Sequence, residues 1–185
     1  MCTSSSSIPL YSPTQAQKPT ALALGSFDGL HAGHRQVISA ISSNSTAIPT
    51  VVSFWPHPRE VLYGESRLRL YLPSEQTSVL APLGVRQLVL IPFDFNLASL
   101  SAEEFVETML IETLQARRIS VGENFRFGKD RKADAYQLQK LAGASDIEVS
   151  VIPILKDKEG RMSSSRIRVA LEAGKLETAK KHLSS

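Results

Sequence analysis

The stretch Gly25-Ser26-Phe27-Asp28-Gly29-Leu30-His31-Ala32-Gly33-His34 decides the fold, because it joins a strand signal to a helix signal. The apolar run at 21–24 is typical of a buried strand, and residues 35–41 have the apolar spacing of a helix. Such a turn is a phosphate site in α/β proteins, because free backbone N–H groups and the positive helix end face the ligand. Histidines placed there can donate hydrogen bonds to phosphoryl oxygens as charge builds up in a transition state. The stretch therefore predicts nucleotide chemistry at a phosphate.

Strand and helix signals alternate along the rest of the chain. They predict strands at 21–27, 50–54, 87–93, 119–122 and 148–155, and helices at 33–43, 74–83, 101–117, 134–143, 164–174 and 176–183. Apolar strands that alternate with helices favour an α/β fold with a mostly parallel sheet, flanked by helices on both faces. Residues 1–19, with a serine run and three prolines, are expected to be a disordered or extended lead-in to a domain at 20–185.

Composition narrows the class of protein. With 185 residues, 42% hydrophobic and 21% charged, the chain is long enough for one globular domain. Its only cysteine is Cys2, and no signal peptide or long apolar run is present, so a cytoplasmic protein without a membrane partner is expected. The basic residues cluster beside Gly- or Ser-rich turns, which indicates an anionic ligand; the absence of a long basic helix disfavours nucleic acid. The clusters are Arg117, Arg118, Arg126, Lys129, Arg131 and Lys132, then Arg161, Arg166 and Arg168.

Three further segments carry candidate chemistry. The loop 54–58 reads Phe-Trp-Pro-His-Pro, and it is either a rigid structural loop or part of a ligand site. The segment 121–129 is either a glycine-rich hairpin with a phenylalanine core or a ring-binding turn in which Asn124 bonds a nucleotide or a metal-bound water. The serine run 163–165 is either a helix cap or a second phosphate cradle. Because ligands bind at the carboxyl ends of parallel strands, the turns at 31–34, 56–58 and 122–124 are expected to meet at one edge.

These motifs together resemble a known family. G-x-F-D-G-x-H-x-G-H at 25–34, F-x-P-H-P at 54–58, G-x-[ND]-F-x-F-G at 122–128 and S-S-[ST]-x-x-R at 163–168 stand in the order found in bacterial FAD synthetases. The chain thus resembles the adenylyltransferase module of the bifunctional riboflavin kinase/FMN adenylyltransferase family. The resemblance implies a Rossmann-like nucleotidyltransferase fold. It also implies transfer of AMP from ATP to FMN, with Mg²⁺ accompanying ATP, by direct attack of the FMN phosphate on the α-phosphate.

The resemblance also implies roles for individual residues, and it assigns no protein metal ligand. The catalytic residues would be His31, His34, Asn124 and Arg168. ATP would be bound by Gly25, Phe27, Asp28, Gly33, Gly122, Ser163, Ser164 and Ser165. The flavin would be bound by Phe54, Pro56, His57, Pro58, Phe125 and Arg126.

Three departures from the family pattern and three alternatives accompany this interpretation. Ala133 stands where the basic loop often has glycine, which alters the expected loop shape. Ser165 stands where threonine is usual, which keeps the hydroxyl. In two-domain members a riboflavin kinase module follows the helix near Leu183, so no kinase activity is expected of these 185 residues. The alternatives are another small-molecule adenylyltransferase, a non-catalytic nucleotide- or flavin-binding protein, and a fragment of a class I aminoacyl-tRNA synthetase.

Overall fold

The central element is a six-stranded sheet in which every neighbouring pair of strands is parallel. The computed structural model describes residues 7–42, 46–66, 68–158 and 160–184. The strands are β1 (Leu10–Tyr11), β2 (Thr20–Leu24), β3 (Ile48–Trp55), β4 (Gln87–Pro92), β5 (Ala116–Gly122) and β8 (Glu148–Ile152), in the order β1-β4-β3-β2-β5-β8. The chain runs outward from β2 through β3 and β4, then returns to the other side of β2 as β5. The order therefore reverses between β2 and β5, where such sheets open a binding crevice.

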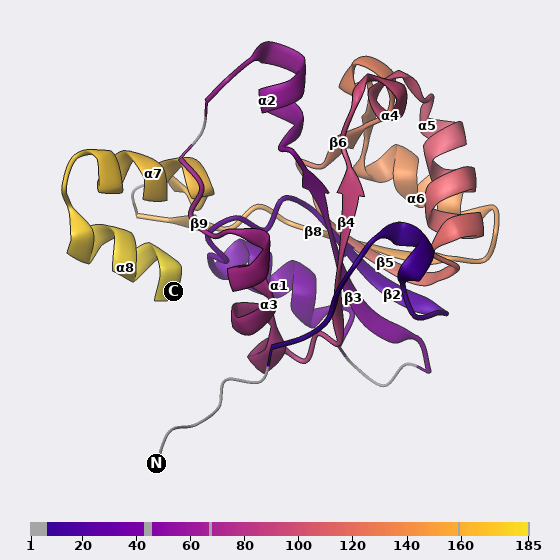
Figure 1. Ribbon diagram of the computed structural model, residues 1–185, viewed down its shortest axis with the longest axis horizontal. Helices are drawn as coiled ribbons and strands as arrows, with labels where there is room; N and C mark the ends of the chain where they lie inside the picture. The colour runs from indigo at the N-terminus through magenta and orange to yellow at the C-terminus, as the bar shows by residue number, and fades with distance from the viewer. Residues whose placement is uncertain (1–6, 43–45, 67, 159, 185) are drawn as a thin grey trace.

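Helices cover both faces of the sheet, which confirms the expected fold class (Figure 1). One face carries α1 (Ala32–Ser39), α3 (Pro73–Leu80) and the 3-10 turn Ala81–Leu83. The other carries α5 (Ala102–Glu104), the π-helix Phe105–Thr113 that continues it, and α6 (Ala135–Gly143). Successive residues of β2 serve opposite cores: Ala21 and Ala23 pack toward α1, whereas Leu22 and Leu24 pack toward α6 and the π-helix.

The smaller elements lie mainly around the carboxyl edge of the sheet. α2 (Pro58–Tyr63) follows β3, and α4 (Phe95–Ser99) follows β4. Two short hairpins, β6 (Arg126–Phe127) with β7 (Ala133–Asp134) and β9 (Lys156–Asp157) with β10 (Gly160–Arg161), follow β5 and β8. The 3-10 turn Lys129–Arg131 lies within the first hairpin. α7 (Ser164–Glu172) and α8 (Leu176–Ser184) pack on each other and close the chain (Figure 1).

Residues 1–19 were expected to be either disordered or extended, and the described part, residues 7–19, is extended. The short strand β1 pairs with β4, a 3-10 turn forms at Pro13–Gln15, and Ala16 is buried. Residues 7–19 are therefore extended and packed on the sheet rather than disordered, because their apolar side chains cover the sheet edge. The serine run Ser4–Ser7 falls mostly on residues 1–6, which lie outside the described residues.

Several expected boundaries were wrong. The helix expected to reach residue 117 ends at Thr113, and residues 116–122 form the strand β5 between β2 and β8. Gln115 marks the change with a left-handed φ of 47°, which a helix does not contain. The first strand stops at Leu24 instead of residue 27, because Phe27 also adopts a positive φ, of 44°. The first helix ends at Ser39, and residue 43 of its expected range is outside the described residues.

Candidate functional site

A cavity of about 500 Å³ opens at the crevice between β2 and β5. Its walls come from the ends of β2, β3, β5 and β8 and from the start of α1. The turns after three strands meet here, as the parallel order predicts. Of the expected site residues, it is lined by Gly25, Phe27, His31, Gly33, His34, Phe54, His57, Pro58, Gly122, Asn124, Phe125 and Arg126.

The two histidines form a stacked pair at the start of α1. His31 is the N-cap residue, and its ring centroid lies 3.8 Å from that of His34, with the two planes 20° apart. The pair has close neighbours on two sides. A Cβ atom on Gly33 would lie 3.2 Å from the His31 ring, and the Phe27 ring lies 5.3 Å from the His34 ring. A glycine at position 33 therefore leaves the imidazoles room to stack.

The surroundings of both imidazoles favour their uncharged form, with His31 buried and His34 half-buried. Desolvation, with a smaller contribution from the charge of Arg161, lowers the pKa of His31 to about 4. Desolvation also lowers the pKa of His34 well below its usual 6.5, and the nearby charges of His31 and Arg168 add to the effect. The Nδ1 atoms of both rings are buried without a hydrogen-bond partner among the described residues. Unsatisfied buried nitrogens are costly, so a phosphoryl ligand that supplies acceptor oxygens and negative charge would stabilise this pair.

Arginines surround the cavity and make it a site for anions. Arg126 lines it while paired with Asp134 at 3.0 Å. Arg131, in a left-handed conformation with φ of 56°, and Arg161, on β10, also line it. Arg131 and Arg161 were not predicted as site residues, although the sequence placed them in basic clusters. Their position beside Gly- or Ser-rich turns is the sequence feature that could have identified them. Arg118 of the first cluster instead pairs with Glu148 across β5 and β8, at 2.8 Å.

A second cavity of about 240 Å³ adjoins the first and is rich in aromatic side chains. Phe54, Pro58, Phe125, Arg126 and Arg131 line both cavities. The aromatic residues found only in the second are Tyr63, Phe93, Phe105 and Phe127. An apolar cavity with aromatic walls and a few cationic groups suits a flat ring system. Leu62, Phe93 and Phe105 also line this cavity. They were not predicted as site residues, because an apolar side chain gives no local sign of whether it faces a core or a cavity.

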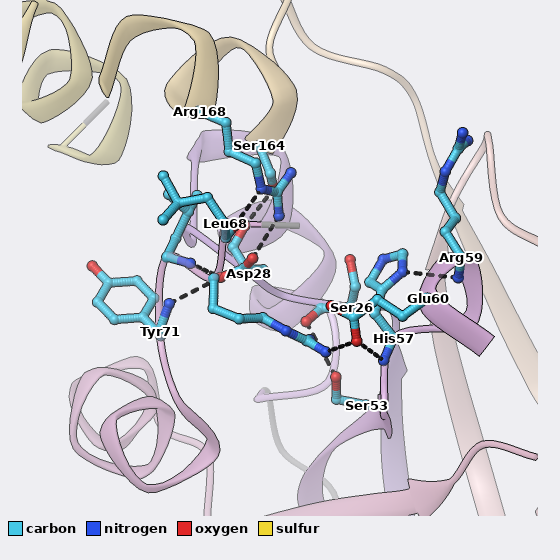
Figure 2. Close-up of polar contacts among 12 residues, drawn as sticks. Ser26, Asp28, Ser53, His57, Arg59, Glu60, Leu68, Tyr71, Ser164 and Arg168 are labelled. Atoms are coloured by element: carbon cyan, nitrogen blue, oxygen red, sulfur yellow. Dashed lines mark hydrogen bonds and ion pairs between the residues drawn. The ribbon is translucent and has the colours of Figure 1, made fainter. Parts of the chain in front are cut away.

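The loop after β3 holds α2 in place at the mouth of the larger cavity. His57 is the N-cap of α2: its Nδ1 accepts a hydrogen bond of 3.1 Å from the backbone N–H of Arg59, and its own N–H donates to Glu60 (Figure 2). Glu60 also pairs with Arg69, whose guanidinium lies 4.2 Å from the Trp55 ring centroid. His57 thus has a structural task in addition to lining the cavity. Pro56, expected to bind flavin, lines neither cavity.

Besides Pro56, five expected site residues do not line the larger cavity: Asp28, Ser163, Ser164, Ser165 and Arg168. Asp28 and Arg168 are joined in a buried ion pair of 2.5 Å, and the hydroxyl of Ser164 donates to the backbone oxygen of Asp28 (Figure 2). The run 163–165 forms the N-cap and first residues of α7 beside this pair, not a wall of either cavity. The sequence motif identified residues that belong together, but it could not show that their charged groups are paired with each other.

The protein side chains do not form a metal centre of their own in the part of the chain that the structure describes. No group of three or more His, Cys, Asp or Glu side chains there is arranged to hold a metal ion. Asn124, expected to bond a nucleotide or a metal-bound water, lines the larger cavity, and a Cβ atom on Gly122 would lie 3.0 Å from its Oδ1. The glycine therefore leaves room for the amide.

None of the described helices is long and apolar enough to cross a membrane.

Comparison with known proteins identifies relatives over most of the chain. The sequence model of the FAD synthetase family matches residues 13–166. The chain is 31% identical to an FAD synthetase of Listeria monocytogenes over 178 residues, 92% of this chain and 71% of that protein. It is 30% identical to the bifunctional riboflavin kinase/FMN adenylyltransferase of Escherichia coli K12, covering 84% of this chain and 51% of the relative. The chain therefore spans about half the length of the bifunctional relatives it matches.

Solved structures agree with the fold. A crystal structure from Streptococcus pneumoniae, described as a macrolide-efflux protein, superposes with a TM-score of 0.81 at 30% identity and covers 96% of this chain and 60% of that one. A pantoate-beta-alanine ligase from Francisella tularensis superposes with a TM-score of 0.53 at 16% identity, and the match covers 86% of this chain and 72% of the ligase chain. This likeness supports the fold alone. The parallel sheet, the paired histidines at its switch point and the match over residues 13–166 lead to one assignment: this chain belongs to the FAD synthetase family.

Proposed function

We propose that this chain is an FMN adenylyltransferase, which joins ATP and FMN into FAD and releases pyrophosphate. The observation that carries the proposal is the stacked, uncharged histidine pair, which lies in a cavity lined by arginines and next to an aromatic cavity. One cavity suits a nucleoside triphosphate and the other a flat ring, so both substrates can reach the histidines together. The family match over residues 13–166 supports the same reaction.

The chemistry required of the protein is positioning and charge stabilisation. The FMN phosphate attacks the α-phosphorus of ATP, the bond to the bridging oxygen breaks, and pyrophosphate leaves with the bonding electrons. No covalent intermediate with the protein is needed. We infer that His31 and His34 donate N–H bonds to the phosphoryl oxygens, where they are most effective as negative charge develops. His31 is buried and His34 half-buried, and the less polar surroundings strengthen these bonds because they screen charge less than water does.

The remaining cavity residues divide between the two substrates. Three glycines let the backbone approach ATP: Gly25, Gly33 and Gly122. The Phe27 ring packs beside the His34 ring and supports the histidine pair. We infer that Arg161 binds the triphosphate, because it lies close enough to His31 to influence its pKa. Phe54, Pro58, Phe125 and Arg126 line both cavities and would contact FMN where its ring and its phosphate meet. The walls Phe93, Phe105 and Phe127 would enclose the isoalloxazine.

Mg²⁺ would arrive on the phosphates of ATP, since no described cluster of side chains could hold it alone. Asn124 is the side chain in the cavity that we expect to contact the metal or its water. When bound, the ion would neutralise part of the phosphate charge. We further propose that the protein acts in the cytoplasm on these small molecules and not on nucleic acid or membranes. The single cysteine and the absence of a long basic helix in the sequence support this.

The test is a comparison of acceptors. Purified protein with Mg²⁺ and ATP is given FMN, riboflavin, nicotinate mononucleotide or phosphopantetheine, and pyrophosphate release is measured for each. We expect release with FMN alone. Release with another acceptor would move the chain to a different adenylyltransferase, and tight FMN binding without release would show a binding protein. The His31→Asn variant is the control for contaminating activity, because we expect it to release far less pyrophosphate.

A further inference from the structure

Three separate segments meet at one buried ion pair. Asp28 and Arg168 are 4% and 8% exposed, and their charged groups lie 2.5 Å apart. Oδ1 of Asp28 accepts hydrogen bonds from the backbone N–H groups of Leu70 and Tyr71, at 2.9 and 3.0 Å. Nε of Arg168 donates to the backbone oxygen of Leu68 at 2.7 Å. We call Asp28 and Arg168 the clasp, and residues 68–71 the strap that it holds.

The clasp joins the histidine turn to the start of α7 as well. Ser164 donates its hydroxyl to the backbone oxygen of Asp28, and Arg168 lies one turn further along the same helix (Figure 2). The packing between these segments leaves no spare room. A Cβ atom on Gly29, whose φ is +82°, would lie 2.4 Å from Leu70 Cδ1 and 3.1 Å from Ile167 Cδ1. The turn is therefore fixed against both the strap and α7 two residues before His31.

Stability alone is a poor explanation for such a pair. Removing two charges from water costs as much as their attraction returns, and apolar residues of similar volume often stabilise a protein equally well. A buried, fully hydrogen-bonded ion pair instead gives a single geometry, because any shift leaves a charge without its partner. Here both Asp28 oxygens and two nitrogens of Arg168 are engaged. The segment so fixed carries the two histidines.

The clasp also sets the charge that His34 experiences. Arg168 is one of the groups that lower the pKa of His34, together with burial and His31. His31 in turn experiences the charge of Arg161. Asp28 offsets the charge of Arg168 at contact distance, so its removal would expose His34 to an uncompensated guanidinium.

We propose that Asp28 and Arg168 are positioning residues for adenylyl transfer: the clasp locks the turn that carries His31 and His34 onto the strap and the start of α7. This inference rests on the proposed function. It gives Arg168 a role through the histidines, in place of the catalytic role that the family resemblance implied. Every bond of the clasp is made between groups of the protein itself, so the chain's own contacts fix the turn that carries the histidines.

The experiment compares three variants. Asp28→Asn is close in size and keeps an oxygen acceptor for the strap amides, but it removes the charge. Arg168→Lys keeps the charge, but a single nitrogen replaces the two that bond Leu68 and Asp28. Thr20→Val is the matched control: it removes a buried hydrogen bond of 2.7 Å to Leu114 at the amino end of β2, away from the cavity. For each we measure kcat, the KM values for ATP and FMN, the melting temperature, and the imidazole ¹⁵N signals.

For Asp28→Asn and Arg168→Lys we expect kcat to fall by about tenfold to a hundredfold, the cost of misplacing a catalytic group slightly. We expect both KM values to stay within about threefold, since direct substrate contacts remain. The imidazole signals of His31 and His34 should shift in both variants and not in Thr20→Val, whose kcat should stay near that of the wild type.

Two outcomes would overturn the inference. One is a large rise in the KM for ATP in Arg168→Lys with kcat retained, which would show that Arg168 binds ATP directly. The other is unchanged kcat and unchanged imidazole signals in a folded Asp28→Asn protein. If that variant does not fold, Arg168→Lys decides by the same measurements. If the wild type itself makes no FAD, the proposed function fails, while the imidazole signals still report whether the clasp positions the histidines.

Discussion

Acid should destabilise this protein before its carboxylates are protonated, because the histidine pair must stay uncharged to remain buried. In the unfolded chain His31 regains its usual pKa of 6.5, whereas in the folded protein its pKa is about 4. Below pH 6.5 the unfolded state binds more protons than the folded state, so the free energy of unfolding falls with decreasing pH. The stability is fully present above pH 6.5 and is lost progressively down to about pH 4.

The size of the effect follows from the same shift. Between pH 7 and pH 5, the folded and unfolded pKa values of His31 predict a loss of about 1.5 to 2 kcal/mol. The lowered pKa of His34 adds a loss of the same sign over the same range. We expect the double variant His31→Asn/His34→Asn to lack this dependence, whatever its stability at pH 7.

Urea unfolding at pH 7 and pH 5 measures the effect. Trp55 is the single tryptophan and is part of β3, so its fluorescence follows unfolding together with the circular dichroism. His57 and His182 are present in both proteins, so their contributions cancel in the comparison. Equal losses of stability in the wild type and the double variant would refute the conclusion that the pair is buried and uncharged.

Three further results are expected at the same site. His31→Ala should keep the fold, because the ring lines a cavity, but initial rates of FAD formation should fall by about a hundredfold or more; normal rates would remove His31 from the mechanism. ATP binding near pH 6 should take up protons, because the triphosphate raises the lowered pKa of His31. Calorimetry in buffers of different ionisation enthalpy measures the proton uptake. Identical binding heats in these buffers would contradict the prediction. Arg161→Gln should raise the Kd for ATP about tenfold and leave the Kd for FMN, measured by fluorescence titration, unchanged. Arg118→Gln, whose side chain pairs with Glu148, is the remote control. A weaker FMN affinity in Arg161→Gln would place Arg161 on the flavin side instead.

The sequence was sufficient for the layer architecture and for the residues that meet at the crevice. Apolar runs at 21–24, 50–54 and 87–93 identified central parallel strands, because strands covered on both faces are apolar throughout. The turns that follow such strands must share one edge, so the meeting of His31, His57 and Asn124 could be predicted without coordinates.

Other features depend on contacts that no local pattern carries. The strand β5 begins at Ala116, where the sequence suggested the end of a helix, because pairing with β2 and β8 overrides local preference. Asp28 and Arg168 are 140 positions apart, and only the packing of α7 against the turn shows that their charges are paired. The aromatic cavity could not be predicted for the same reason. Phe93 follows β4 and Phe105 begins the π-helix, and only the packing of these elements shows that both side chains line a cavity.

The measurement that tests the central claim most directly is the conversion of FMN by the purified protein with ATP and Mg²⁺. FMN and FAD are separated by chromatography, and pyrophosphate is measured in the same samples. We predict FAD and pyrophosphate in equal amounts from the wild type, with product strongly reduced in the His31→Asn variant. Absence of FAD from the folded wild-type protein, or equal FAD formation by the variant, would contradict the account.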